Sequence, residues 1–205
     1  MVTMTTEHYT LGMARSQTIT EVNGRATIFV AALTSGLVAL GFLEPSGTTF
    51  EVFALVLFPT LAFLGLVTFH RVLQNSIEDL GYAYRIDLCR RFYVDAWPML
   101  APYLYRPGLE QDSREPSHSG KQRLFSWQLL LTVSGTIGVL TGLLLGAFGA
   151  VVSRTLIGSP IGVAFGVGAA FAALSIFALH RQQRRAFARA DFSQVDAQMH
   201  RLERS

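Results

Sequence analysis

Apolar residues gather in four long runs along this chain, near residues 26–43, 51–69, 127–150 and 157–179. A helix of about 20 residues is needed to cross roughly 30 Å of hydrocarbon, and each run is close to that length. Polar and charged residues lie between and around the runs. The pattern predicts an all-α protein with four transmembrane helices, arranged as two hairpins with polar helical extensions.

The last two runs carry a small residue at every fourth position. At about 3.6 residues per turn, this spacing keeps the small residues on one slowly drifting stripe of a helix. A surface without large side chains allows close backbone approach, which favours helix association in lipid. The two stripes pack against each other within one subunit or join subunits, and we expect a homo-oligomer. The predicted packing residues are Ser134, Gly138, Gly142 and Gly146 in the third run, and Gly158, Gly162, Gly166 and Ala170 in the fourth.

The region after the second run divides into a helix and a loop. Between residues 73 and 97 the apolar positions recur every three or four residues, which predicts an amphipathic helix that continues the second span. Pro59 and Gly81 are its expected points of bend or break. The prolines that follow exclude a long helix up to residue 124. The apolar positions of the helix are Leu73, Ile77, Leu80, Tyr84, Leu88 and Phe92.

The C-terminal tail shows a second, more irregular apolar face, which we expect to pack against the helix at 73–97. Its members are Phe187, Phe192, Val195, Met199 and Leu202. The two halves of the chain also resemble a tandem repeat, because Phe69-His70-Arg71 and Leu179-His180-Arg181 end their second spans. The predicted segments are 1–25 (N-terminal), 26–69 (first hairpin), 70–97 (amphipathic helix), 98–124 (Pro-rich loop), 125–180 (glycine-rich hairpin) and 181–205 (basic helical tail).

The distribution of positive charge predicts the orientation. Of 17 Lys and Arg residues, only Arg154 lies in a connection between the two spans of a hairpin. The positive-inside rule therefore places both termini and residues 70–124 in the cytoplasm, and the chain in a bacterial inner membrane. Charged residues make up 15% of the chain, against about 25% in globular proteins. Four arginines directly after the last run are expected to meet anionic lipid headgroups: Arg181, Arg184, Arg185 and Arg189.

Candidate chemistry is sparse. His70 and His180 end two spans at similar depth and are candidate axial ligands of a haem iron, although histidines beside arginines are ordinary at a membrane interface. The His, Cys, Asp and Glu residues lack zinc-ligand spacing, so we predict no metal site and no resident cofactor. The centres of the spans carry no ionisable residue, which disfavours a coupled transporter.

Enzyme activity and nucleic-acid binding are not expected, because the chain has no nucleotide loop, triad or carboxylate pair, and no aromatic platform beside its arginines. The span interiors do carry hydroxyls, among them Thr34, Ser35, Thr132, Thr136 and Thr141. These hydroxyls either bond to carbonyls of their own helix or line a pore between subunits. The single cysteine, Cys89, excludes an intramolecular disulfide.

The residues before the first run, Glu21-Val22-Asn23-Gly24-Arg25-Ala26, resemble the start of small transmembrane effectors in bacterial cyclic-nucleotide anti-phage systems, the Pycsar-type and related families. The resemblance covers about 25 residues and the general layout. It implies a protein that perturbs the inner membrane when activated. This chain lacks the nucleotide-sensing domain of those families, so the resemblance does not indicate its trigger.

Together these patterns predict a non-enzymatic membrane protein that self-associates and acts as a channel-like or membrane-perturbing oligomer, controlled from the cytoplasmic side. The alternative is an accessory or scaffold subunit, whose exposed apolar faces are covered by other membrane subunits.

Overall fold

The computed structural model describes residues 2–44, 47–100, 102 and 131–189. These residues form four long α-helices, a short 3-10 helix and no strand, which confirms the all-α prediction. Each long helix has the length and apolar composition to cross a membrane. The elements are α1 (Val2–Gly41), α2 (Thr48–Ala96), η1 (Pro98–Leu100), α4 (Val133–Ile157) and α5 (Ile161–Arg189).

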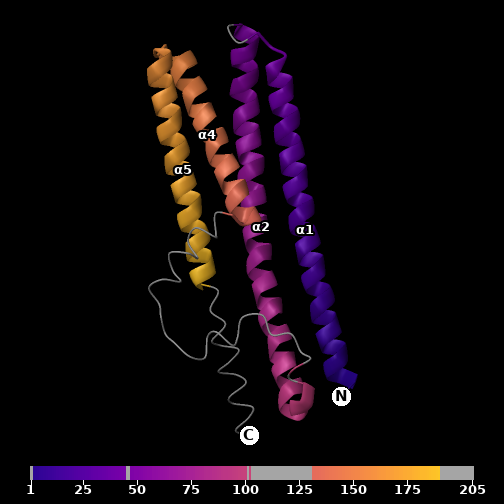
Figure 1. Cartoon of the computed structure of the whole chain (residues 1–205). Helices are drawn as coiled ribbons and strands as arrows, with labels where there is room; N and C mark the ends of the chain where they lie inside the picture. The colour runs from indigo at the N-terminus through magenta and orange to yellow at the C-terminus, as the bar shows by residue number, and fades with distance from the viewer. Residues whose placement is uncertain (1, 45–46, 101, 103–130, 190–205) are drawn as a thin grey trace.

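The helices lie in a row that follows the order of the chain (Figure 1). Each helix packs on the next, so α2 and α4 are inner helices, while α1 and α5 make no contact along their described lengths. At 1.5 Å per residue, the 49 residues of α2 span about 74 Å, whereas the 25 residues of α4 span about 38 Å. The first two helices therefore extend far beyond the other two. We call this extension, residues 2–25 of α1 and 71–96 of α2, the stalk.

Helix α2 differs from the expectation of a bend or break, because it continues through Pro59 and Gly81 as one helix. Helix α1 begins at Val2, so the described part of the N-terminal segment at 1–25 is helical. Proline is tolerated in membrane helices where neighbouring helices and local adjustments satisfy the freed backbone groups. Pro59 is part of α2, which packs between α1 and α4. Pro59 and Gly81 are therefore not points where the helix ends.

The glycine-rich hairpin turns at Gly158, which has φ +66° and caps the C-terminal end of α4. A residue in this left-handed conformation is most often glycine, because it has no Cβ to clash. Helix α5 starts at Ile161, after Pro160, rather than near residue 157. At the other end α4 starts after Thr132, and residues 127–130 of the predicted run lie outside the described residues.

Helices α1 and α2 share one antiparallel register from the membrane part into the stalk. Phe29 packs on Gly65 within the apolar part, and Leu11 packs with Ile86 and Cys89 in the stalk. One set of buried and half-buried positions of α2 recurs alternately at four and three residues, which is the heptad pattern of a coiled coil. Other buried residues of α2, namely Ala62, Phe69 and Leu73, lie outside this set. The set is Ala54, Phe58, Leu61, Gly65, Thr68, Val72, Asn75, Asp79, Tyr82, Ile86, Cys89 and Tyr93.

Candidate functional site

The small residues of α4 lie at close helix contacts within the chain. A Cβ on Gly146 would stand 2.6 Å from the carbonyl oxygen of Gly168 and 2.5 Å from the Cβ of Ala172. Gly142 lies equally close to Ile176, and Gly138 lies against the ring of Phe69 on α2. The α4 stripe therefore packs against α5 and α2 in the same subunit.

The small-residue stripe predicted on α5 does not lie at the contact with α4. Among the described residues, no atom comes within 4 Å of the place where Gly158, Gly162 or Gly166 would carry a Cβ, and Ala170 is exposed. Of the small residues of α5, Gly168 and Ala172 contact α4, and Ala164 is buried on the same face. Helix α5 thus has small residues on two faces. One face packs on α4, and the other, which holds Gly162, Gly166 and Ala170, is open among the described residues.

A buried glutamine joins the ends of α4 and α5. Gln183 is only 1% exposed, and its Nε2 donates to Ser134 Oγ at 3.0 Å and to Thr132 Oγ1 at 3.1 Å. Thr132 also caps α4, because its Oγ1 accepts from the Gly135 amide at 3.2 Å. Sequence reasoning missed Gln183. The available signal was its place seven residues after Ile176 and four after Leu179, on the apolar face that turns toward α4.

Three hydroxyls of the apolar segments, those of Thr34, Thr136 and Thr141, bond within their own helices. Thr141 Oγ1 donates to the Ile137 carbonyl at 2.7 Å, and Thr34 Oγ1 donates to the Val30 carbonyl at 2.9 Å. Thr136 makes the same bond to Thr132. This geometry matches the packing interpretation of the hydroxyls.

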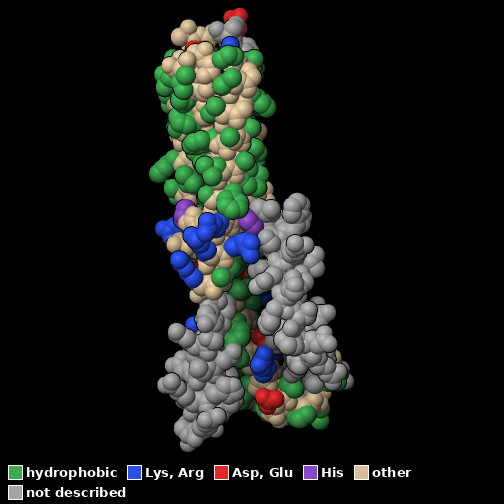
Figure 2. All heavy atoms as spheres, turned by 90° about the vertical axis from the view of Figure 1, so that its left-hand side faces the viewer, with side chains coloured by type: hydrophobic (Ala, Val, Ile, Leu, Met, Phe, Trp, Pro, Cys, Tyr) green, Lys and Arg blue, Asp and Glu red, His purple; other side chains and the backbone are tan. Residues whose placement is uncertain are grey.

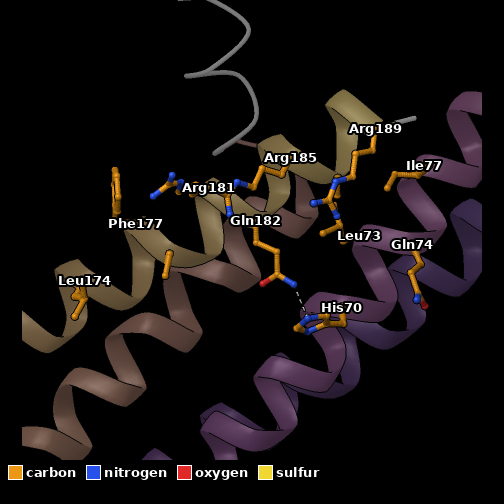
Figure 3. Close-up of a pocket in the computed structure, with 12 residues that line it drawn as sticks. His70, Leu73, Gln74, Ile77, Leu174, Phe177, Arg181, Gln182, Arg185 and Arg189 are labelled. Carbon is orange, nitrogen blue, oxygen red and sulfur yellow. Dashed lines mark hydrogen bonds between the residues drawn. The ribbon is translucent and has the colours of Figure 1, made fainter. Parts of the chain in front are cut away.

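A groove of about 660 Å³ lies between α2 and α5 at the lower end of the apolar part (Figure 3). Half of its lining residues are apolar, and three arginines spaced four residues apart on α5 also line it. Figure 2 shows positive side chains and histidines gathered below the apolar surface on this side of the molecule. The lining residues are His70, Leu73, Gln74 and Ile77 of α2, and Leu174, Phe177, Ala178, Arg181, Gln182, Arg185, Ala186 and Arg189 of α5.

The predicted headgroup cluster is thus divided between two faces. Arg181, Arg185 and Arg189 line the groove, whereas Arg184 is exposed but is not among the lining residues.

The two candidate haem ligands are not brought to one cavity. His70 lines the groove, but His180 is absent from its walls. The Gln182 amide Nε2 lies 2.8 Å from His70 Nε2 and, as a donor, assigns that ring nitrogen as acceptor. His70 Nδ1 then donates to the Leu66 carbonyl at 2.9 Å. Both nitrogens of His70 are therefore engaged, which does not favour axial ligation. The described residues also contain no group of three or more His, Cys, Asp or Glu side chains placed to hold a metal ion.

One face of α2 in the stalk packs on α1. Arg15 Nε lies 2.9 Å from Asp79 Oδ1, and the Tyr93 hydroxyl lies 3.5 Å from Thr5 Oγ1. On the predicted apolar face, Leu80 and Phe92 are nearly half exposed among the described residues. Phe187 packs beside the core of the membrane part. The other predicted tail positions, Phe192, Val195, Met199 and Leu202, lie outside the described residues.

No family model, curated protein or solved structure matches this chain. The resemblance to anti-phage effectors stays a prediction from residues 21–26, which lie within α1 and include an ion pair between Glu21 and Arg25 at 2.7 Å.

Proposed function

We propose that this chain is a non-enzymatic protein of the bacterial inner membrane that self-associates through the open face of α5. The assembly acts as a channel-like or membrane-perturbing oligomer, and the stalk, on the cytoplasmic side, controls its state. If the resemblance at residues 21–26 holds, the membrane-perturbing form is that of an anti-phage effector.

The observation that carries this proposal is the division of small residues between two faces of α5. The face with Gly168 already packs on α4, whereas the face with Gly162 and Gly166 makes no close contact with the residues that the structure describes. Small-residue faces are favoured where helices approach closely in lipid. A second copy presenting the same face would give a symmetric contact, the commonest arrangement in homo-oligomers.

The fold also supports an assembly rather than a pore within one chain. The row of four helices encloses no central space, because α1 and α5 do not meet along the residues that the structure describes. Any conducting path would therefore lie between subunits. The common register of α1 and α2 connects the stalk to the membrane part, so a partner or ligand that changes the stalk could shift the helices in the bilayer.

The oligomer is tested by Gly166→Leu, with Ala31→Leu as the matched control. Ala31 is a small exposed residue in the apolar part of α1. Both variants should keep the thermal stability of the subunit, because neither site is packed against other described residues. Cross-linking in membranes and mass measurement in nanodiscs should give a smaller assembly for Gly166→Leu only. A monomeric wild-type protein, or equal assemblies for wild type and Gly166→Leu, would contradict self-association through this face.

The activity is tested by leakage of dye from liposomes. Full-length protein should release dye, and truncation after Arg189 should change the release rate, if the tail contributes to control. If both proteins are inert at high protein-to-lipid ratio, the accessory-subunit function is preferred. That alternative rests on the same open face of α5 and requires a different membrane protein to cover it.

The orientation is tested by cysteine labelling of intact cells, in a background with Cys89→Ser. A cysteine introduced at Thr155 should react with an impermeant reagent from outside, as should one at Ser46, whereas one at Ser113 should not. Labelling at Ser113 would reverse the proposed orientation.

A further inference from the structure

The groove between α2 and α5 has an apolar surface on its membrane side and a positively charged surface next to it. On the membrane side its wall is formed by Leu174 and Phe177 (Figure 3). Next come Arg181 and Arg185, one and two turns further along the same face of α5. The positions from Arg181 to Arg189 rise about 12 Å along the helix. An apolar surface is therefore continuous with a row of positive charge.

The positive charges over the groove are not neutralised by the described part of the chain. None of the residues that line it is acidic, and the ion pairs between described residues involve Arg15, Arg25 and Arg91 instead. A guanidinium group binds phosphate with several N–H donors in a fixed fork geometry. Three such groups beside a groove favour a phosphate-bearing ligand.

We propose that this groove binds an anionic phospholipid, with its phosphate held by Arg181 and Arg185 and an acyl chain lying along Leu174 and Phe177. Basic pockets between membrane helices are a known way of holding lipid headgroups, and here the charge and the apolar wall match the two ends of one molecule. The proposal rests on the membrane placement given above and not on self-association or leakage.

Such a lipid would join two helices that are only weakly joined by the protein itself. Helices α2 and α5 touch at few points, and the bond between His70 and Gln182 crosses the groove. A lipid between them adds contacts to both helices at the level where α2 leaves the apolar part and enters the stalk. Occupancy of the groove should therefore raise the thermal stability of the membrane part.

Two adjacent arginines provide a matched control for the phosphate-binding end of the groove. Arg184 and Arg185 are adjacent and both exposed, but only Arg185 lines the groove. Diffuse attraction to an anionic surface would depend equally on the two charges, whereas a bound lipid would depend on Arg185 alone. Phe177 and Phe165 form a second pair, because both are exposed on α5 and only Phe177 lines the groove.

The test is a titration of full-length protein in detergent with phosphatidylglycerol or phosphatidylcholine, with bound lipid counted by native mass spectrometry. Arg185→Gln should weaken binding of the first phosphatidylglycerol molecule about fivefold, and Arg184→Gln should weaken it less than twofold. Phe177→Ala should weaken it more than Phe165→Ala does. Wild-type protein should retain phosphatidylglycerol in preference to phosphatidylcholine and gain thermal stability from it.

Four results would overturn the proposal. Equal losses for Arg184→Gln and Arg185→Gln would indicate diffuse attraction, and equal retention of the two lipids would remove the role of charge. Full competition by inorganic phosphate would indicate an anion site without lipid. A severalfold gain in retention on truncation after Arg189 would show that residues 190–205 occupy the groove in the whole protein.

Discussion

The α4–α5 hairpin and the stalk are both antiparallel helix pairs, but they are held together by different means. In the hairpin, Gly146 and Gly168 bring the two backbones together, and the larger side chain of Ile176 packs directly on a glycine of α4. In the stalk, Leu11, Ile86 and Cys89 form a small apolar cluster, and Arg15 and Asp79 form an ion pair beside it.

The difference follows from the solvent of each region. Lipid gives no hydrophobic drive, so helices there associate through close packing and hydrogen bonds, which small residues and Gln183 provide. A stalk in water gains from burying Leu11 and Ile86, but polar residues such as Arg15, Thr18 and Asn75 interrupt its core positions. A polar residue at a core position specifies register at a cost in stability. The stalk should therefore open more easily than the hairpin.

The largest effect is expected for Gly146→Leu in the hairpin. The new Cβ would stand within 2.6 Å of the Gly168 carbonyl oxygen, so the backbones must separate. Overpacking of this kind costs about 1–3 kcal/mol, and backbone contact places this site at the upper end. Thermal unfolding in nanodiscs measures the loss. Gly162→Leu is the control, since no described side chain or neighbouring helix lies within 4 Å of a Cβ at Gly162. Equal stability for wild type and Gly146→Leu would remove the distinction between the two regions.

The next effect is expected for Leu11→Ala in the stalk. Leu11 is buried, and loss of such a side chain costs about 2–5 kcal/mol in a well-packed core; the small size of this cluster favours about 2 kcal/mol. Cys89 is the only cysteine and is 7% exposed, so its alkylation reports opening of the stalk. In Leu11→Ala the rate of Cys89 alkylation should rise about 30-fold.

Met13→Ala serves as the control for Leu11→Ala, because Met13 is exposed on the same helix. Cys89 of the Met13→Ala variant should be alkylated at the wild-type rate. Rapid alkylation in the wild-type protein itself would mean that the stalk is already open, and would contradict the described packing of α1 on α2.

A smaller effect is expected for Gln183→Leu. The change removes two hydrogen bonds between α5 and the start of α4, and interhelical hydrogen bonds in membranes are worth about 0.6 kcal/mol on average. We expect a loss of about 1 kcal/mol in thermal unfolding. Gln182→Leu, next to it on the exposed side, should change stability less. If Gln182→Leu is the more damaging, the buried bonds do not hold the hairpin as described.

The sequence predicted the parts of the fold that depend on a single pattern. The apolar runs determine the number of spans. On α4 the small residues lie along one face, and Gly138, Gly142 and Gly146 of that face contact α2 and α5. Helix α5 carries small residues on two faces, and the pattern alone does not distinguish the stripe of Gly162 from that of Gly168. The position of the α4–α5 turn decides between them.

The partner of the amphipathic helix was missed for a different reason. Residues 1–25 do follow a heptad, but several of its positions are polar, among them His8, Arg15 and Thr18. Apolar periodicity alone therefore does not predict that this segment is a helix that packs on α2. Its pairing depends on long-range complementarity, such as Arg15 with Asp79, which no local pattern reveals. Gln183 was missed similarly, because its buried place depends on the hydroxyls of Thr132 and Ser134.

The smallest effect is expected for Arg15→Gln, which breaks the ion pair of the stalk. The side chains of Arg15 and Asp79 are 42% and 26% exposed, so water and salt screen the pair. Pairs of this kind contribute about 0.2–1 kcal/mol, and Cys89 alkylation should rise no more than about fivefold. High salt should produce the same rise in the wild type and none in Arg15→Gln. Arg85→Gln, at an exposed stalk position, is the control. An effect of Arg15→Gln as large as that of Leu11→Ala would show that charge, rather than apolar burial, holds the stalk closed.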